Sequence, residues 1–180
     1  MEKEKTVIFI DGSNFYHILK RLFPQQKPNN FNFEKFVNYL SKDKELIKTY
    51  YYNAPLDITN DKEKYIKQQQ FFDKIKRIPK FNFVLCRMQK RIINGKVIYE
   101  VKEDDIHLAV DMIRLAYKDY YNLAILISSD GDFVPVVQAV REINKKVENI
   151  GFENKFSYHL KHSCNGFRKL NQSELHQFFD

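Results

Sequence analysis

The sequence has little cysteine and no long apolar run. Its two cysteines, Cys86 and Cys164, lie far apart in the chain, which excludes a disulfide framework and the ligand spacing of a zinc finger. We therefore expect a cytoplasmic protein. The longest apolar runs, such as residues 7–10 and 123–127, are too short to cross a bilayer. The charged first residues lead directly into a predicted strand, so we expect no signal peptide and no membrane partner.

Recognisable nucleophile and zinc sites are also missing. No Cys/His or Ser/His pairing stands in the context of a catalytic nucleophile. His159 and His162 lie near Cys164, but no fourth ligand follows at a recognisable spacing. The chain shows no internal repeat and no linker, and 180 residues suit one buried core rather than two ordinary domains. We predict a single domain over residues 1–180.

Basic residues outnumber acidic ones. The 30 lysines and arginines exceed the 23 aspartates and glutamates, which gives a formal net charge of +7 and a pI of about 9.2. A surface of this sign attracts polyanions. Lysine-rich solvated faces are also common in proteins that bind no polyanion, so the charge alone does not decide the function.

Strand and helix patterns alternate along the chain. Apolar β-rich runs that end in polar turns predict strands, and apolar residues at helical spacing predict helices between them. One helix carries Ile106, Val110, Ile113 and Tyr117 on one stripe. This alternation predicts right-handed βαβ units and a mostly parallel sheet covered on both faces. The predicted strands span 6–10, 47–52, 81–86, 123–127 and 147–151, and the predicted helices span 15–22, 33–40, 61–78, 104–120 and 133–143.

A β-hairpin is predicted over residues 91–99. Asn94 and Gly95 stand between two β-branched runs, which is the strongest short-range signal for a hairpin. We expect this hairpin to project from the main sheet. Residues 24–30 have the composition of a loop, and the segment beyond residue 152 is amphipathic without a clear period.

Two predicted strands end on aspartates within Gly-containing turns. The first strand closes on Asp11, and the strand at 123–127 is followed by Asp130 and Asp132. Sites in open parallel sheets form beyond the carboxyl ends of strands, so neighbouring strands would bring these carboxylates together. A further acidic group, residues 103–105, opens the central helix. A single such aspartate is more often a helix cap. Three acidic turns at one rim instead indicate a bound cation, and oxygen ligands suit Mg²⁺ or Mn²⁺.

Asp111 is predicted to lie within an apolar stretch of the central helix, residues 108–113. On a helix, Asp104 and Asp111 share a face, whereas Asp105 points elsewhere. A buried carboxylate needs partners. Asp111 therefore either accepts hydrogen bonds from the turn at 11–14 or helps to hold the metal, and we favour the supporting role.

Four segments of the chain resemble the motifs of NYN domains. Residues 7–14, Val-Ile-Phe-Ile-Asp-Gly-Ser-Asn, resemble the opening motif of the family. Residues 102–112, Lys-Glu-Asp-Asp-Ile-His-Leu-Ala-Val-Asp-Met, are similar to the LabA-like segment Lys-Gly-Val-Asp-x-x-Leu-Ala-Val-Asp-Met. Residues 126–135 are similar to a strand that ends in the turn Ser-Gly-Asp-x-Asp-Phe-x-Pro. The closing pattern Ser-x-x-Leu followed by Phe-x-x-Leu is matched by Ser157, Leu160, Phe167 and Leu170.

This resemblance implies a PIN-like, Rossmann-like α/β fold. The expected architecture is a three-layer sandwich with a central mostly parallel sheet and the projecting hairpin. In members with known activity, the resemblance implies endoribonuclease chemistry at an acidic metal site. It carries over Asp11, Asp105 and Asp130 as metal-binding and catalytic residues, Asp132 and Asp111 as further acidic residues of the site, and Asn14 and Ser128 as polar residues that order the turns.

The chain departs from the family pattern at three places. Glu103 and Asp104 replace Gly-Val, which makes the entry to the central helix more acidic and stiffer. Ser129 replaces a glycine. Cys164 and Asn165 replace the closing Ala-Asp, so the C-terminal acidic position of the pattern is not acidic here, while the central set is intact.

The expected activity is metal-dependent hydrolysis of RNA. Asp11 and Asp130, with Asp105 or Asp132, would hold one or two Mg²⁺ or Mn²⁺ ions that activate a water molecule. We expect RNA as the partner and no organic cofactor. The hairpin would contact RNA, unless it covers a sheet edge or forms the seam of a homodimer. The basic residues expected to contact RNA are Lys20, Arg21, Arg87, Lys90, Arg91 and Lys96, together with Lys145 and Lys146.

Two other functions stay open. LabA-like proteins include regulators, so a non-catalytic RNA-binding or regulatory module with the same fold is the main alternative. A phosphatase of another α/β family is disfavoured, because Asp11 lacks the second aspartate, two positions on, that a phosphoaspartate site requires. Ser13 stands at that position.

Overall fold

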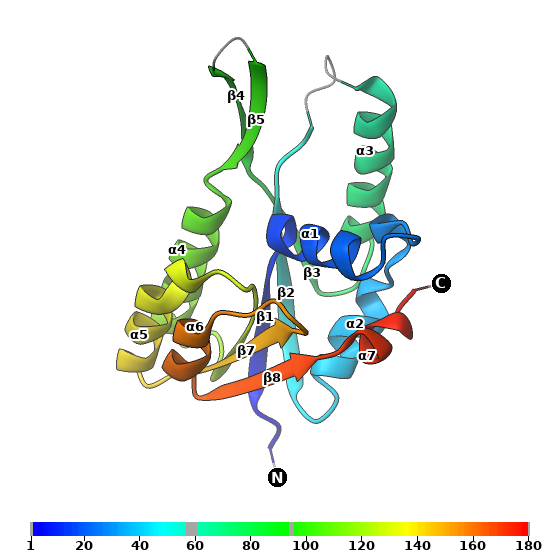
Figure 1. Cartoon of the computed structure of the whole chain (residues 1–180). Helices are drawn as coiled ribbons and strands as arrows, with labels where there is room; N and C mark the ends of the chain where they lie inside the picture. The colour runs from blue at the N-terminus through cyan, green and yellow to red at the C-terminus, as the bar shows by residue number, and fades with distance from the viewer. Residues whose placement is uncertain (1, 57–60, 94–95, 180) are drawn as a thin grey trace.

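The chain forms a parallel sheet of six strands, shown in Figure 1 as a computed structural model that describes residues 2–56, 61–93 and 96–179. The strands are β1 (Lys5–Asp11), β2 (Glu45–Asn53), β3 (Phe81–Leu85), β6 (Leu123–Ile127), β7 (Lys146–Phe152) and β8 (Gly166–Leu170). Their order in the sheet is β3-β2-β1-β6-β7-β8. Each neighbouring pair is parallel, which confirms the predicted sheet.

Helices cover both faces of this sheet (Figure 1). In β1, Ile8 and Ile10 pack with the apolar side chains of α1, α2, α3 and α7, whereas Val7 and Phe9 pack with those of α4, α5 and α6. The alternation follows from the two-residue period of a strand. It confirms the predicted three-layer α/β sandwich. The helices are α1 (Gly12–Leu22), α2 (Phe33–Leu40), α3 (Lys62–Lys76), α4 (Asp104–Tyr117), α5 (Val134–Glu142), α6 (Tyr158–Ser163) and α7 (Gln172–His176), with short 3-10 helices η1 (Pro28–Asn30) and η2 (Gly131–Phe133).

A cluster of phenylalanines fixes α1 against the sheet. The ring of Phe15 lies between 5.2 and 5.9 Å, centroid to centroid, from those of Phe31, Phe33, Phe36 and Phe152. Buried aromatic rings supply a large apolar area, and pairs in these geometries add to it. The first turn of α1 is therefore held in one position relative to β1 and β7.

Gly12 is the point of closest approach between α1 and the sheet. A Cβ atom at this position would lie 2.4 Å from the backbone carbonyl oxygen of Tyr52 and 2.6 Å from the ring of Tyr51. Only glycine fits such a contact. The absence of a side chain at Gly12 lets α1 begin directly at the end of β1, where Asp11 caps it.

The hairpin is longer than the sequence predicts. It pairs β4 (Arg87–Ile93) with β5 (Lys96–Lys102) in antiparallel register, from Arg87 opposite Lys102 to Ile93 opposite Lys96. The predicted Asn-Gly turn at 94–95 lies outside the described residues. The hairpin and α3 extend from the carboxyl edge of the sheet on either side of α1 (Figure 1).

Three of the four residues in the predicted apolar stripe of α4 face solvent, whereas Ile113 packs against the core. Ile106, Val110 and Tyr117 are all more than half exposed. The side of α4 that packs on the sheet consists of Leu108, Met112, Leu115 and Ala116. Both faces carry apolar residues at helical spacing, so the sequence pattern alone does not distinguish them.

The segment beyond residue 152 contains three short elements. After α6, β8 adds the sixth strand by pairing in parallel with β7, and α7 packs into the core with Leu175 fully buried. Elements of five or six residues are too short to show a clear period in sequence. No helix among the described residues has the length and apolar character needed to cross a membrane.

We expect Gly12→Ala to destabilise the fold by about 1–3 kcal/mol, because the added methyl group overlaps backbone and ring atoms that pack tightly. Urea unfolding measures the effect. Gly166→Ala is the matched control, since its nearest atom would be in ordinary contact at 3.5 Å. Equal stability losses in the two variants would contradict the close approach at Gly12.

Candidate metal centre

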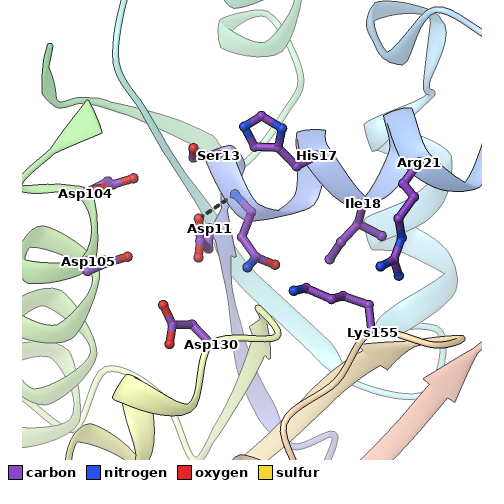
Figure 2. A pocket seen from close by; sticks show the side chains of 10 residues that line it. Asp11, Ser13, His17, Ile18, Arg21, Asp104, Asp105, Asp130 and Lys155 are labelled. Carbon is purple, nitrogen blue, oxygen red and sulfur yellow. Dashed lines mark hydrogen bonds between the residues drawn. The ribbon is translucent and has the colours of Figure 1, made fainter. Parts of the chain in front are cut away.

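A cavity of about 550 Å³ lies beyond the carboxyl ends of β1 and β6. These two strands are direct neighbours, with Thr6 opposite Leu123 and Ile10 opposite Ile127. The acidic turns that follow them therefore meet, as the sequence predicts. Figure 2 shows Asp11, Asp104, Asp105 and Asp130 around this cavity.

Asp11 is buried and its carboxylate is held from two sides. Its side chain is 5% exposed. Oδ1 accepts a hydrogen bond from the backbone N–H of Asn14 at 2.9 Å, and Oδ2 accepts one from the hydroxyl of Ser128 at 3.0 Å. The first bond also caps α1. The two bonds orient the carboxylate toward the cavity.

Side-chain hydrogen bonds join the two turns to each other. Asn14 Oδ1 accepts from both the backbone N–H and the hydroxyl of Ser129, at 3.2 and 3.1 Å. The Ser128 hydroxyl, which donates to Asp11, also accepts from the backbone N–H of Asp130 at 3.1 Å. Because each turn is tied to the other, the relative positions of Asp11 and Asp130 are fixed.

Asn149, on β7, supports the turn that follows β6, and it was not identified from the sequence. Its fully buried side-chain amide donates to the carbonyl oxygens of Leu126 and Ser128, at 3.1 and 3.0 Å. It thereby fixes the backbone at the end of β6. The available signal was an amide two residues after Val147 on the alternating buried positions of the predicted strand, where a buried polar group requires partners.

Three carboxylates gather at the cavity. One oxygen each of Asp11, Asp104 and Asp105 lies within 4.8 Å of the others. An Mg²⁺ ion holds oxygen ligands at about 2.1 Å, so ligands on opposite sides of it are roughly 4.2 Å apart. Ligands at right angles around the ion are roughly 3.0 Å apart. The three oxygens are therefore close enough for side-chain adjustments to bring them onto one small divalent cation.

The sequence predicts that Asp105 points away from the helix face shared by Asp104 and Asp111, but an oxygen of Asp105 lies within 4.8 Å of one from Asp104. Both residues belong to the first turn of α4, which follows Glu103, an N-cap residue in a left-handed backbone conformation. Both direct an oxygen toward Asp11. Asp104 is therefore an additional candidate ligand that the sequence analysis did not select.

The pKa values of Asp11 and Asp105 are both raised. Burial is the main cause that raises the pKa of Asp11 to about 7, and the charges of Asp105 and Asp104 add smaller increases. The hydrogen bonds from Asn14 and Ser128 act in the opposite direction. Partial burial and the charges of Asp104, Asp130 and Asp132 raise the pKa of Asp105 to about 6. A bound cation would offset both the desolvation and the repulsion.

Asp130 lies at the rim of the cavity, and Asp132 lies just outside it. Asp130 lines the cavity, and its Oδ1 accepts a hydrogen bond from the backbone N–H of Asp132 at 2.9 Å. Asp132 is exposed, and it does not line the cavity, but its charge contributes to the raised pKa of Asp105. Of these two aspartates, Asp130 is thus the one that forms part of the cavity wall.

Asp111 lies outside the carboxylate cluster. Its Oδ2 accepts a hydrogen bond from the Tyr52 hydroxyl at 3.0 Å, and its Oδ1 forms an ion pair with Arg114 at 2.7 Å. The sequence analysis favoured hydrogen bonds from the turn at residues 11–14. In the structure, Tyr52 and Arg114 are the partners of Asp111 instead. The residue joins α4 to β2, and burial together with the Asp111 charge raises the pKa of Tyr52.

Basic side chains form the wall opposite the carboxylates. Figure 2 shows Arg21 and Lys155 across the cavity from Asp104 and Asp105. Arg21 donates to the carbonyl oxygen of Asn154 at 3.1 Å, which holds the guanidinium in place. The cavity therefore presents a negative wall to a cation and a positive wall to an anion.

His17 and Lys155 also line this cavity, and the sequence analysis did not select them. The signal for His17 was its position on α1. Asn14, His17 and Arg21 follow at intervals of three and four residues and so share one helix face. Lys155 lies in the segment where the sequence showed no clear period, so no pattern indicated it.

Four other basic residues predicted to contact RNA, which are Lys20, Arg87, Lys90 and Arg91, are not among the described residues that line the cavity. Lys20 and Lys90 are exposed outside it, and Arg87 forms an ion pair with Glu103 at 2.9 Å. Arg91 lies on the hairpin in β4, and the side chain of Lys96 is outside the described part of the structure. Any RNA contact by the hairpin would therefore lie beyond the acidic site.

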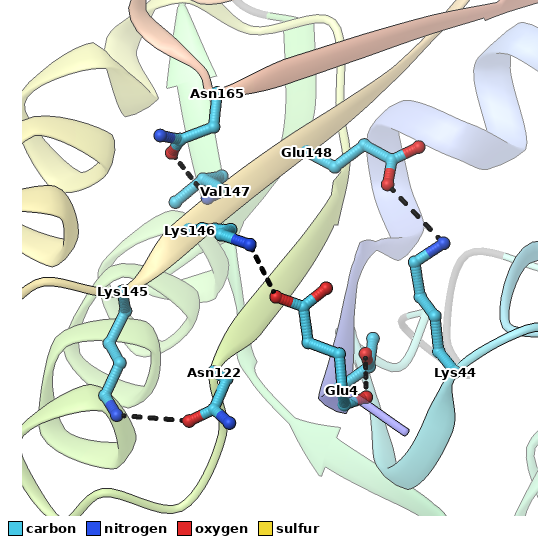
Figure 3. Close-up of polar contacts among 9 residues, drawn as sticks. Glu4, Lys44, Asn122, Lys145, Lys146, Val147, Glu148 and Asn165 are labelled. Carbon is cyan, nitrogen blue, oxygen red and sulfur yellow. Dashed lines mark hydrogen bonds and ion pairs between the residues drawn. The ribbon is translucent and has the colours of Figure 1, made fainter. Parts of the chain in front are cut away.

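Lys145 and Lys146 lie at the wrong edge of the sheet for contact with this site. Lys146 begins β7, so it lies at the amino ends of the parallel strands. Figure 3 shows Lys146 paired with Glu4 and Lys145 beside Asn122. Any contact of these two lysines with RNA would therefore lie away from the acidic site.

The raised pKa of Asp11 gives metal-free protein a specific pH dependence. The folded chain keeps Asp11 protonated where the unfolded chain has already ionised it, so the free energy of unfolding falls as pH rises from about 4 to about 7. We expect Asp11→Asn to remove the Asp11 part of this decline, roughly 4 kcal/mol at most, and to leave the smaller part that Asp105 contributes. Urea unfolding at about pH 5 and about pH 8, with and without Mg²⁺, measures it. The same decline in both proteins would contradict the burial of an ionisable Asp11.

Comparison with known proteins supports the fold and assigns the family. The family model of the NYN domain matches residues 5–171. The crystal structure of a protein of unknown function from Vibrio parahaemolyticus is similar, with 25% sequence identity and a TM-score of 0.72 over 94% of each chain. A proposed oxidoreductase from Parabacteroides merdae matches 82% of this chain and 25% of its own, at 13% identity and a TM-score of 0.33, and carries no argument. No curated protein matches. The NYN match spans nearly the whole length, and the chain therefore belongs to the NYN domain family.

Proposed function

We propose that this protein is a metal-dependent ribonuclease that cleaves phosphodiester bonds within RNA. NYN domains are generally nucleases, which supports hydrolysis of a nucleic acid. The observation that carries the proposal is the cavity itself, where three carboxylates face an arginine and a lysine. Two finer parts of the proposal are that the enzyme cuts within the RNA strand and that it belongs to the LabA-like subgroup. Both rest on the resemblance of residues 102–112 and 128–135 to LabA-like motifs.

The acidic wall would hold the cation. Asp11, Asp104 and Asp105 offer hard oxygen ligands, which suit Mg²⁺ or Mn²⁺. A divalent cation bound there supplies a Lewis acid that activates water and offsets negative charge on the phosphate. The hydrogen bonds of Asn14 and Ser128 would keep the Asp11 carboxylate oriented for this role.

The basic wall would hold the phosphate. Arg21 and Lys155 lie across the cavity from the carboxylates, so a phosphodiester between the two walls would contact positive charge on both sides. Asp130, at the rim, would accept a hydrogen bond from the attacking water and so orient it. The net charge of +7 would draw the RNA backbone toward the surface.

We expect Asp11→Asn to reduce RNA cleavage about a hundred-fold or more in the presence of Mg²⁺ or Mn²⁺, because the amide is neutral and binds a cation poorly. Cleavage of labelled single-stranded RNA is the measurement, and a chelator should abolish it in the wild type. Asp119→Asn is the control, because this exposed aspartate pairs with Lys145 away from the cavity. RNA left intact across titrations of both metals, but bound equally well with chelator, would instead support a non-catalytic RNA-binding module.

Removal of either basic group should weaken substrate binding. We expect Arg21→Ala and Lys155→Ala to raise KM about ten-fold, since each loses a charged contact with the phosphate. Lys20→Ala is the matched control, because Lys20 precedes Arg21 on α1 and lies outside the cavity. Steady-state cleavage kinetics measures the change. An equal effect of all three substitutions would point to general surface charge rather than to a phosphate-binding wall.

A further inference from the structure

A second cavity, of about 430 Å³, adjoins the metal cavity. The two share Ser13 and His17 of α1 as lining residues. The second cavity lies between α1 and α3, beyond the end of β2, and its volume is typical of pockets that hold small organic groups. A chain whose phosphate lay in the first cavity would therefore have its neighbouring group within reach of the second.

The interior of the second cavity is apolar and partly aromatic. Phe71, Phe72 and Ala54 are buried at its base. Tyr16 lines it from α1, is 38% exposed, and lies edge-on to His17 with ring centroids 5.6 Å apart. A partly exposed aromatic ring beside an apolar base offers a face on which a planar ring can stack.

Amide groups give this cavity a fixed polar edge. Gln68 accepts a hydrogen bond from the backbone N–H of Leu56 at 2.7 Å and donates to the carbonyl oxygen of Ala54 at 3.1 Å. It thereby fixes the chain after β2. Asn53 and Asn29 also line the cavity, and their amides can both donate and accept. Such groups match the hydrogen-bonding edges of nucleobases.

Lysines surround the apolar interior. Lys64 and Lys67 line the cavity from α3 and form ion pairs with Asp61 and Glu63. Lys27 also lines the cavity. A neutral apolar ligand would gain nothing from this positive charge, whereas a nucleotide carries a phosphate beside its planar base.

We propose that the second cavity binds the unpaired base of the nucleotide next to the scissile phosphate, with Tyr16 as the stacking platform. This inference rests on the proposed ribonuclease function and names its substrate class as single-stranded RNA. A base can enter such a cavity only when it is neither paired nor stacked within a helix. The shared residues Ser13 and His17 place the base site directly beside the metal site.

The experiment uses a short single-stranded RNA of mixed sequence and a set of copies in which one nucleotide at a time lacks its base. Binding is followed by fluorescence anisotropy in the presence of chelator, and cleavage is followed with Mn²⁺. The proteins are the wild type, Tyr16→Ala and Tyr16→Phe. Tyr117→Ala is the matched control, because Tyr117 is a more exposed tyrosine on α4, which contributes no residue to this cavity.

We expect one position of the RNA at which removal of the base has a specific effect. There, the affinity and the cleavage rate should both fall about ten-fold, for the wild-type protein and for Tyr117→Ala alike. Tyr16→Ala should show the same loss with intact RNA and little further loss with the abasic copy, and Tyr16→Phe should retain binding. Pairing the RNA with its complement should abolish the base-dependent part of the affinity.

The outcomes separate this proposal from the ribonuclease proposal. Metal-dependent cleavage at equal rates for every abasic copy, unchanged in Tyr16→Ala, would overturn the base site and leave the ribonuclease standing. Base-dependent binding that Tyr16→Ala abolishes, without cleavage in any metal, would support the base site and contradict the ribonuclease. Neither binding nor cleavage would overturn both.

Discussion

The burial of Asp11 beside the carboxylates of Asp104 and Asp105 is the constraint on which the rest of the site depends. These carboxylates meet in a cavity where Asp11 is almost completely buried, and two hydrogen bonds compensate only part of the cost of its charge. Protonation or a cation must supply the remainder. The fold maintains this arrangement because α1 starts directly on the sheet at Gly12, and because Asn149 fixes the neighbouring turn. The fold thus holds these charges together despite their repulsion.

The sequence predicted the parts of the structure that depend on local pattern. Apolar runs that end on Asp11 and before Asp130 predicted two parallel strands with acidic turns, and β1 and β6 are neighbours. Asn14 and Ser128 stand where the motif places turn-ordering residues, and both form hydrogen bonds between the turns. These predictions succeeded because strand ends, turns and caps are determined by a few adjacent residues.

Features that depend on long-range packing were not predictable from the pattern. The orientation of Asp104 depends on the left-handed backbone at Glu103, and neither composition nor period indicates it. The exposed stripe of α4 has the same spacing as the buried one, so only the position of the helix on the sheet distinguishes them. Lys155 reaches the cavity from a segment without a clear period. The cavity beside Tyr16 forms only when α1, α3 and the end of β2 come together.

The proposed ribonuclease requires a divalent cation between β1 and the first turn of α4. Crystals soaked in Mn²⁺ test it most directly, since anomalous scattering locates the ion without reference to activity. The account predicts an anomalous peak in contact with oxygens of Asp11, Asp104 and Asp105. An ordered cavity with no peak at Mn²⁺ concentrations that saturate other carboxylate sites, or a peak bound only by residues outside this cluster, would contradict it.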